Sequence, residues 1–319
     1  MRRYVIGRIL QAVGVLWAAF TLSFIVLYLL PSDPVAIAAD AAPGTPVDPA
    51  AVAELRARYG LDQPIWQQYW TALTHAVRGD LGHSIGTGRS VTGALGDALP
   101  STLALASLAM LLAIVGGTAL AVAAAYTERP WLRGLLSALP SVGAAMPTFW
   151  VGLLLLQVFS FQLRLVPAFG GTGFGGTILP AITLAIPVGA VIAQVLYSSL
   201  IGTWRQPFVE VAFAKGASRW WVQLRHVLRP ASGAALTVAG LWVGTVLAGS
   251  VVVETVFARD GIGRLTQEAV LRQDIPVVQG VVTFAAVVFV TVNLFVDLVH
   301  PLLDPRVAHI RPTKERAHA

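Results

Sequence analysis

Two glycine-rich stretches are the first candidates for chemistry in this sequence. GTGFGG (residues 171–176) has the GxGxxG spacing of a dinucleotide-binding loop, and GTGRS (residues 86–90) loosely resembles a phosphate-binding loop. A dinucleotide loop must join a strand to a helix, whereas residues 171–176 join two strongly apolar segments. Residues 86–90 lack the lysine and the spacing of a phosphate loop. We therefore expect no nucleotide site in either stretch, and a flexible loop at 171–176.

The other ionisable and nucleophilic residues also form no recognisable centre. The sequence has no HExxH and no GxSxG, and its six histidines are not spaced as metal ligands. Without cysteine it has no disulfide and no thiolate metal site. The sequence thus predicts that the chain is not an enzyme, contains no ATPase and holds no metal.

Charges inside the apolar segments are rare. Glu254 and Asp297, the latter close to His300, each lie near one end of such a segment. Ion and proton relays place ionisable groups within the membrane interior, so we interpret these carboxylates as structural caps. If the protein transports a solute, another subunit must then supply the energy for transport.

Composition identifies lipid as the solvent of most of the chain. The 319 residues are 56% hydrophobic and 12% charged, with a mean hydropathy of +0.72, whereas soluble domains contain about 25% charged residues. The apolar run at 9–30 is longer than a signal-peptide core of roughly 7–15 residues. We expect a retained first span.

Six apolar segments are long enough to cross a hydrocarbon core of about 30 Å as helices. In lipid, each segment must be helical so that its backbone N–H and C=O groups form hydrogen bonds within the segment. The sequence therefore predicts an all-α membrane protein with six transmembrane helices at about 9–30, 100–126, 134–162, 178–200, 231–256 and 276–302.

The basic residues predict the orientation of these spans. With both termini cytosolic, the cytosolic segments hold 14 of the 22 Lys and Arg and the outer segments hold eight. This asymmetry follows the positive-inside rule. The high pI, near 10.2, therefore reflects the basic residues that orient the spans. We expect no nucleic-acid partner.

Proline and glycine patterns predict how the spans bend and pack. The third and fourth segments share a seven-residue proline spacing: Pro140 and Pro147, Pro180 and Pro187. Such prolines kink helices, and the bends either serve packing or shape a pathway. Gly240 and Gly244 form a GxxxG in the fifth segment, which favours close helix approach.

The outer loop, residues 31–98, should contain two short helices. Asp48 and Pro49 have the types of an N-cap and a first helical residue, and Gly60 is placed to end that helix. After Pro64, a second helix carries an apolar stripe of Trp66, Tyr69, Trp70, Leu73 and Val77. This stripe either packs at the spans and the membrane interface or docks an external partner.

The largest cytosolic connection is polar and basic, and reads EVAFAKGASRWWVQLRHVLRPA from residue 210. We expect a helix over 208–215, a turn at Gly216 with positive φ, and a second helix over 219–228 capped by Ser218. Pro230 should mark the junction with the next span. The second helix would expose aromatic and apolar positions that bind either anionic lipid or a protein.

This connection resembles the EAA loop of ABC-importer permeases. Glu210, Ala212 and Gly216, followed by Leu228, match its pattern, while Val211 and the position of Pro230 depart from it. Elsewhere, RYGLDQPIWQQYW, RGDLGHSI, LPSTLALA, ETVFARDGIGRL, DIPVVQGVV and VNLFVDLVHPLLDPRV resemble the dipeptide and oligopeptide (DppB/OppB-like) branch. The resemblance covers nearly the whole chain.

The resemblance implies a type I importer permease in the bacterial cytoplasmic membrane. Its partners would be a second homologous permease, two ATPase subunits that bind ATP and magnesium, and an extracytoplasmic substrate-binding protein. This chain would bind no cofactor. The ATPase-coupling residues would be Glu210, Ala212, Gly216, Arg219, Trp220, Trp221, Leu224 and Leu228. Substrate-binding residues are unknown.

The implied organisation has four parts. Residues 1–30 form the N-terminal tail and first span, 31–98 the outer loop, 99–303 the permease core with its cytosolic loop at 201–230, and 304–319 a cytosolic tail. Short peptides are the expected cargo, and nickel, opines or glycosidic compounds are alternatives carried by related permeases. A stand-alone channel or secondary carrier is a further alternative.

Overall fold

The computed structural model describes residues 2–28, 49–168, 173 and 175–303, and these ranges are helical apart from loops and one isolated β-bridge between His83 and Ser90. The long helices are α1 (Arg2–Tyr28), α5 (Val91–Tyr126), α6 (Pro130–Ala145), α8 (Gly175–Trp204), α11 (Leu228–Val256) and α13 (Ile275–Leu303). The shorter ones are α3 (Pro49–Arg58), α4 (Ile65–Val77), α7 (Thr148–Leu155), α9 (Pro207–Ala214), α10 (Arg219–Trp221) and α12 (Ile262–Leu271). Two π-helical segments, Leu156–Gln162 and Val222–Val227, continue from α7 and α10. The predicted all-α class is confirmed for the described residues.

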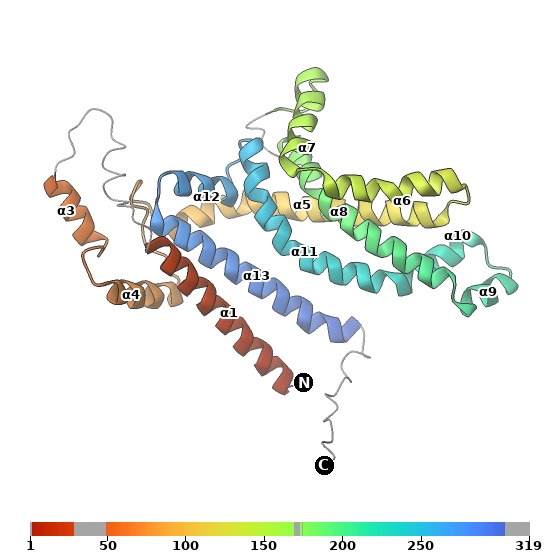
Figure 1. The fold of residues 1–319 in the computed structure, drawn as a ribbon, viewed down its shortest axis with the longest axis horizontal. Coiled ribbons are helices and arrows are strands. Elements are labelled where there is room, and N and C mark those ends of the chain that lie inside the picture. The colour runs from red at the N-terminus through yellow and green to blue at the C-terminus, as the bar shows by residue number, and fades with distance from the viewer. Residues whose placement is uncertain (1, 29–48, 169–172, 174, 304–319) are drawn as a thin grey trace, which may run out of the picture.

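Three long helices form the centre of the molecule. Figure 1 shows α5, α8 and α11 running through its middle, with α1 and α13 side by side along one flank. The short helices α9 and α10 lie at one end, and α3, α4 and α12 lie toward the other. The fold therefore separates the two polar regions predicted from the sequence.

Small residues allow the central helices to touch through their backbones. A Cβ on Gly117 of α5 would lie 2.5 Å from the carbonyl oxygen of Gly189 in α8, and one on Gly189 would lie 3.2 Å from the Ala113 oxygen. In α11, a Cβ on Gly244 would lie 2.8 Å from Cδ2 of Phe289 in α13. Gly244 thus makes room for a phenylalanine ring of α13, a side-chain contact, and the close helix approach expected from the GxxxG pattern stays a prediction.

Four helices are long and apolar enough to cross a bilayer by themselves: Ile6–Tyr28, Val91–Tyr126, Gly175–Trp204 and Arg219–Val256. A fifth span results if the pair Pro130–Ala145 and Thr148–Gln162 crosses as one, and the apolar helix Ile275–Thr291 is shorter. These counts of spans cover the described residues, so the six-span topology remains a prediction.

The predicted third span is not one kinked helix. α6 and the helix that begins at Thr148 meet at an angle of 104°. Met146 has extended backbone angles (φ −75°, ψ 130°) because the ring of Pro147 disfavours a helical residue before it. Pro180 and Pro187 nevertheless lie within the unbroken α8. The shared proline spacing therefore predicts kinks, but it does not predict which helix breaks.

The first predicted helix of the outer loop is confirmed. It is α3, which begins at Pro49 and is followed by Gly60 with φ of +65°. Asp48, the expected N-cap, lies outside the described residues. Half of the GTGFGG stretch also lies outside the described residues, although Gly173 has φ of +73° and α8 begins at Gly175. No conclusion about a flexible loop follows there.

The second predicted outer helix is α4, and its apolar stripe is divided between two environments. The Tyr69 ring packs against Phe24 of α1 with centroids 5.3 Å apart, and its hydroxyl is 2.8 Å from Oγ1 of Thr21. Trp66 and Trp70 are exposed. The prediction that the stripe packs against the spans is confirmed for Tyr69, and the two tryptophans remain available to the membrane interface or to a partner.

Glu254 caps a helix that the sequence did not reveal. Its carboxylate accepts hydrogen bonds from the backbone N–H of Gly263 at 2.7 Å and of Arg264 at 3.4 Å, in the first turn of α12. Thr102 of α5 donates to it at 2.7 Å. The side chain is fully buried. The predicted capping role is confirmed for Glu254, whereas the side chain of Asp297 lies outside the described residues.

Candidate functional site

The cytosolic connection predicted from the sequence forms a compact projection at one end of α8 and α11. We call residues 207–227 the knob. Its first helix, α9, has Val209 and Ala212 on a buried face, at 3% and 9% exposure. Glu210 is exposed in the first turn, where the helix dipole favours a carboxylate. The outer face carries exposed apolar side chains: Phe208, Val211 and Phe213.

The turn after α9 has the geometry predicted for it. Gly216 has φ of +81°. Its N–H donates to the Phe213 oxygen at 2.8 Å, and the N–H of Ala217 donates to the Ala212 oxygen at 3.2 Å. These two bonds form a Schellman motif, which ends a helix through a residue with left-handed backbone angles. Gly216 therefore sets the angle between the two halves of the knob.

Arg219 anchors the knob to the ends of two central helices. It makes an ion pair with Glu128, in the turn after α5. Its guanidinium also lies 5.1 Å from the ring centroid of Tyr126 and 5.7 Å from that of Trp204 in α8. The Trp220 ring meets Tyr126 edge-on at 5.4 Å. These contacts place Arg219 within the protein as a support for the knob surface.

The second half of the knob differs from the predicted separate helix. Ser218 caps it as expected, with Oγ accepting from Trp221 N–H at 3.4 Å, but the chain then runs through Val222–Val227 into α11 without a break. Pro230 lies inside α11 rather than at a junction. Proline lacks an N–H and its ring crowds the carbonyl four residues earlier. The wider π-helical turn beneath Pro230 accommodates both effects.

The predicted apolar stripe of this segment divides into a surface and a core part. Trp220 and Trp221 are each 50% exposed and Leu224 is 40% exposed. Val227 is fully buried in the core cluster, and Leu228 packs partly buried against it. The exposed part of the predicted coupling set is therefore Glu210, Gly216, Trp220, Trp221 and Leu224. Ala212 is buried and Leu228 is partly buried beneath this surface.

Comparison with known proteins identifies the family. Residues 113–309 match the family described as binding-protein-dependent transport system inner membrane component, and residues 1–106 match its N-terminal family. The chain belongs to this family. It is an ABC-importer permease of the DppB/OppB type and a multi-pass protein of the inner membrane. The family of the EAA-loop resemblance is thereby confirmed.

Curated relatives match the permease over nearly its full length. The glutathione transport system permease protein GsiC of Salmonella paratyphi A is 35% identical over 309 residues, which is 97% of this chain and 100% of that protein. GsiC of Escherichia coli K12 is 34% identical over the same length. A solved structure of the inward-facing MetNI methionine ABC transporter has a TM-score of 0.53 at 15% identity, covering 66% of this chain and 95% of that chain. The last likeness concerns the fold alone.

The permease contains a second polar cluster that sequence reasoning missed. Asp274, 6% exposed at the start of α13, accepts a 2.5 Å bond from the Ser84 hydroxyl and bonds from the N–H groups of Ile85 and Gly86 at 3.2 and 3.3 Å. The carboxylate fixes the GTGRS turn in the loop that the sequence predicts to be external. An aspartate directly before a helix is a local capping signal, but nothing local indicates partners about 190 positions away.

Proposed function

We propose that this permease is one of two membrane subunits of an ATP-driven importer that takes up short peptides from an extracytoplasmic binding protein. The observation that carries the proposal is the exposed apolar surface of the knob at Trp220, Trp221 and Leu224. Exposed tryptophans supported by a rigid base are typical of interface hot spots. An ATPase subunit is the partner that a permease without its own energy source needs.

The knob is suited to transmit motion because it is held by the helices that it would move. Arg219 joins it to the turn after α5 through Glu128, and the second half continues directly into α11. A displacement of the docked ATPase would then turn these helices as rigid bodies. The partner ATPases would bind ATP and magnesium, and this chain would bind no cofactor.

The proposed topology has six spans with both termini in the cytosol. The excess of Lys and Arg in the segments assigned to the cytosol supports it, as does the separation of the knob from α3, α4 and α12 (Figure 1). In this orientation the knob faces the cytosolic ATPases, and the outer helices face the binding protein.

Replacing Trp221 with glutamate tests the docking surface. We expect the Trp221→Glu variant to insert normally and to lose ATPase co-purification at least about tenfold, because a charge replaces an interface aromatic. The matched control is Trp66→Glu on α4, since Trp66 is also exposed but lies on the outer side. Full ATPase retention by Trp221→Glu would contradict the proposal and favour a knob that lies on lipid, or a stand-alone carrier.

The cargo is a separate part of the proposal. Relatives at 34–35% identity are named as glutathione transport permeases, which supports a peptide-like cargo. We expect the binding protein that works with this permease to carry peptides when purified, as read by mass spectrometry. A metal chelate, an opine or a glycoside in its place would replace the peptide assignment while leaving the permease assignment intact.

A further inference from the structure

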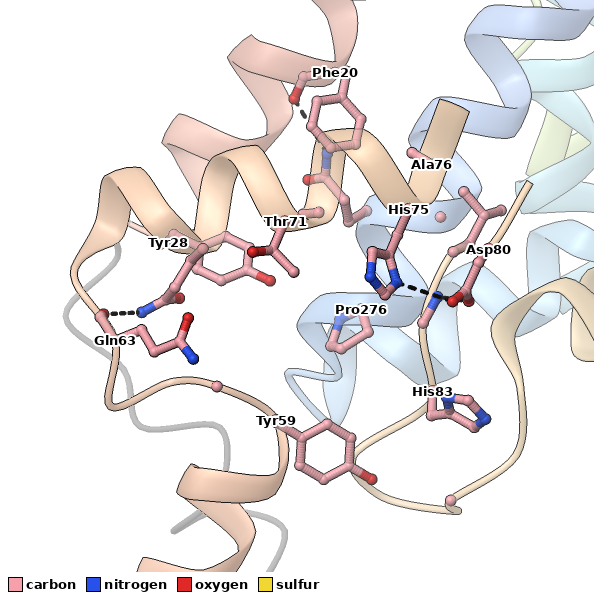
Figure 2. Close-up of a pocket in the computed structure, with 18 of the residues that line it drawn as sticks. Phe20, Tyr28, Tyr59, Gln63, Thr71, His75, Ala76, Asp80, His83 and Pro276 are labelled. Carbon is pink, nitrogen blue, oxygen red and sulfur yellow. Dashed lines mark hydrogen bonds and ion pairs between the residues drawn. The ribbon is translucent and has the colours of Figure 1, made fainter. Parts of the chain in front are cut away.

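A cavity of about 590 Å³ lies on the outer side of the molecule, away from the knob. Figure 2 shows Tyr28, Tyr59, His75 and Pro276 around one central space. These residues come from α1, the turn after α3, α4 and the start of α13, and the segment from Asp80 to Gly88 also lines the cavity. The volume is that of a small-molecule site.

One buried acceptor in this wall has no partner. Gln279 of α13 lines the cavity and is 7% exposed. Its Nε2 donates to the Phe20 carbonyl at 3.1 Å, but its Oε1 accepts no hydrogen bond from the described residues. An unmet buried acceptor costs about 1–3 kcal/mol. A ligand that brings a donor would recover this cost.

The charge of the lining favours a cation. The Asp80 carboxylate belongs to the cavity, whose lining has no Lys or Arg and includes two histidines, His75 and His83. A hydrogen bond from the backbone N–H of Gly82, followed by one from His75, lowers the pKa of Asp80, so the carboxylate stays ionised. The aromatic residues Phe20 and Tyr28 also line the cavity. An anionic ligand would be repelled by the Asp80 carboxylate.

We propose that this cavity binds a primary ammonium group. An ammonium has three donors and no acceptor, which suits the unpartnered Gln279 oxygen and the Asp80 carboxylate. Two sources offer this group on the outer side: the amino terminus of a short peptide, and the ethanolamine headgroup of a lipid beside the exposed tryptophans of α4. The inference does not depend on ATPase coupling or on the transported cargo.

Saturation-transfer NMR on the full chain in phosphatidylcholine nanodiscs tests the ammonium site. The probe is glycylglycinamide, which has an ammonium and no carboxylate, and the matched ligand is its N-acetyl derivative. We expect signal transfer to the first and not to the second. Equal transfer to both, or transfer to neither, overturns the proposal.

Two variants locate the site. Gln279→Leu keeps an apolar chain of similar size without the acceptor, and should weaken glycylglycinamide binding about tenfold. Gln279→Glu loses the donor to the Phe20 carbonyl but retains an acceptor oxygen, and it should therefore bind more tightly than Gln279→Leu. Gln279→Leu also leaves the Phe20 carbonyl without its donor. A second variant, Asp80→Asn, changes an exposed residue and tests the site independently. It should also weaken glycylglycinamide binding. Unchanged binding in Asp80→Asn and in a folded Gln279→Leu overturns the proposal.

Nanodiscs that contain phosphatidylethanolamine distinguish the two sources. If the lipid headgroup occupies the cavity, adding this lipid suppresses the glycylglycinamide signal. If a free amine is the occupant, the signal is unchanged. Either result supports an ammonium site once the acetylated ligand has failed to bind.

Discussion

Replacing Gly216 with valine is expected to reduce uptake at least tenfold while leaving the permease in the membrane. The native turn has φ of +81°, and a β-branched residue in that region costs about 1–3 kcal/mol. A Cβ at this position would meet no atom within 4 Å, so the valine would act through the backbone and not through a clash. The Schellman turn would open, and the exposed Trp220 and Trp221 would change their position relative to α9.

The measurement separates coupling from assembly. In reconstituted complexes, Gly216→Val should retain its ATPase subunits in part, but loaded binding protein should no longer stimulate ATP hydrolysis linked to uptake. Gly216→Asn is the matched control, because asparagine tolerates left-handed backbone angles and occupies the same open space. We expect it to keep most of the uptake. Normal uptake by Gly216→Val would remove Gly216 from the coupling mechanism.

The sequence predicted this turn well because its signals are local. A glycine placed after one apolar helix and a serine before the next define a left-handed turn and an N-cap within a few residues. Both are present, at Gly216 and Ser218. The same holds for Gly60 after α3. Each of these features depends on neighbours along the chain, so the pattern alone was sufficient.

Features set by contacts between distant segments could not be predicted in this way. Asp274 depends on Ser84, and Glu254 depends on Thr102 and on a short helix with no strong sequence signal. The inward contacts of Arg219 likewise require the ends of α5 and α8 to meet the knob. An arginine on a basic helix has the same local pattern whether it faces a partner, lipid or its own protein.

The helix irregularities mark a similar limit. Of the prolines with equal spacing, Pro147 interrupts its helix but Pro187 does not. Pro230 follows a π-helical turn without ending its helix. Proline always removes one donor and crowds one carbonyl. Whether the helix bends, widens or breaks depends on which neighbouring helices re-satisfy those groups, and a single sequence does not contain that arrangement.

Gly117→Ala is the second substitution with a large expected effect. The α5–α8 crossing brings the Gly117 position within 2.5 Å, measured from an added Cβ, of the Gly189 carbonyl oxygen. That oxygen belongs to the backbone of an unbroken helix and has no rotamer by which to move away. The methyl group must therefore push α8 from α5, with the destabilisation of about 1–3 kcal/mol or more that is typical of overpacked cores.

Gly116 provides the control within the same helix. An added Cβ at Gly116 would meet no atom within 4 Å, and alanine favours the helix over glycine by roughly 1 kcal/mol. In detergent or nanodiscs, the midpoint of thermal unfolding should fall for Gly117→Ala and stay level or rise for Gly116→Ala. Equal midpoints for the two variants would mean that α5 and α8 do not meet at this crossing. The C-terminal end of α8 leads directly to the knob. A change in how α8 crosses α5 should therefore also reduce uptake in Gly117→Ala and not in Gly116→Ala.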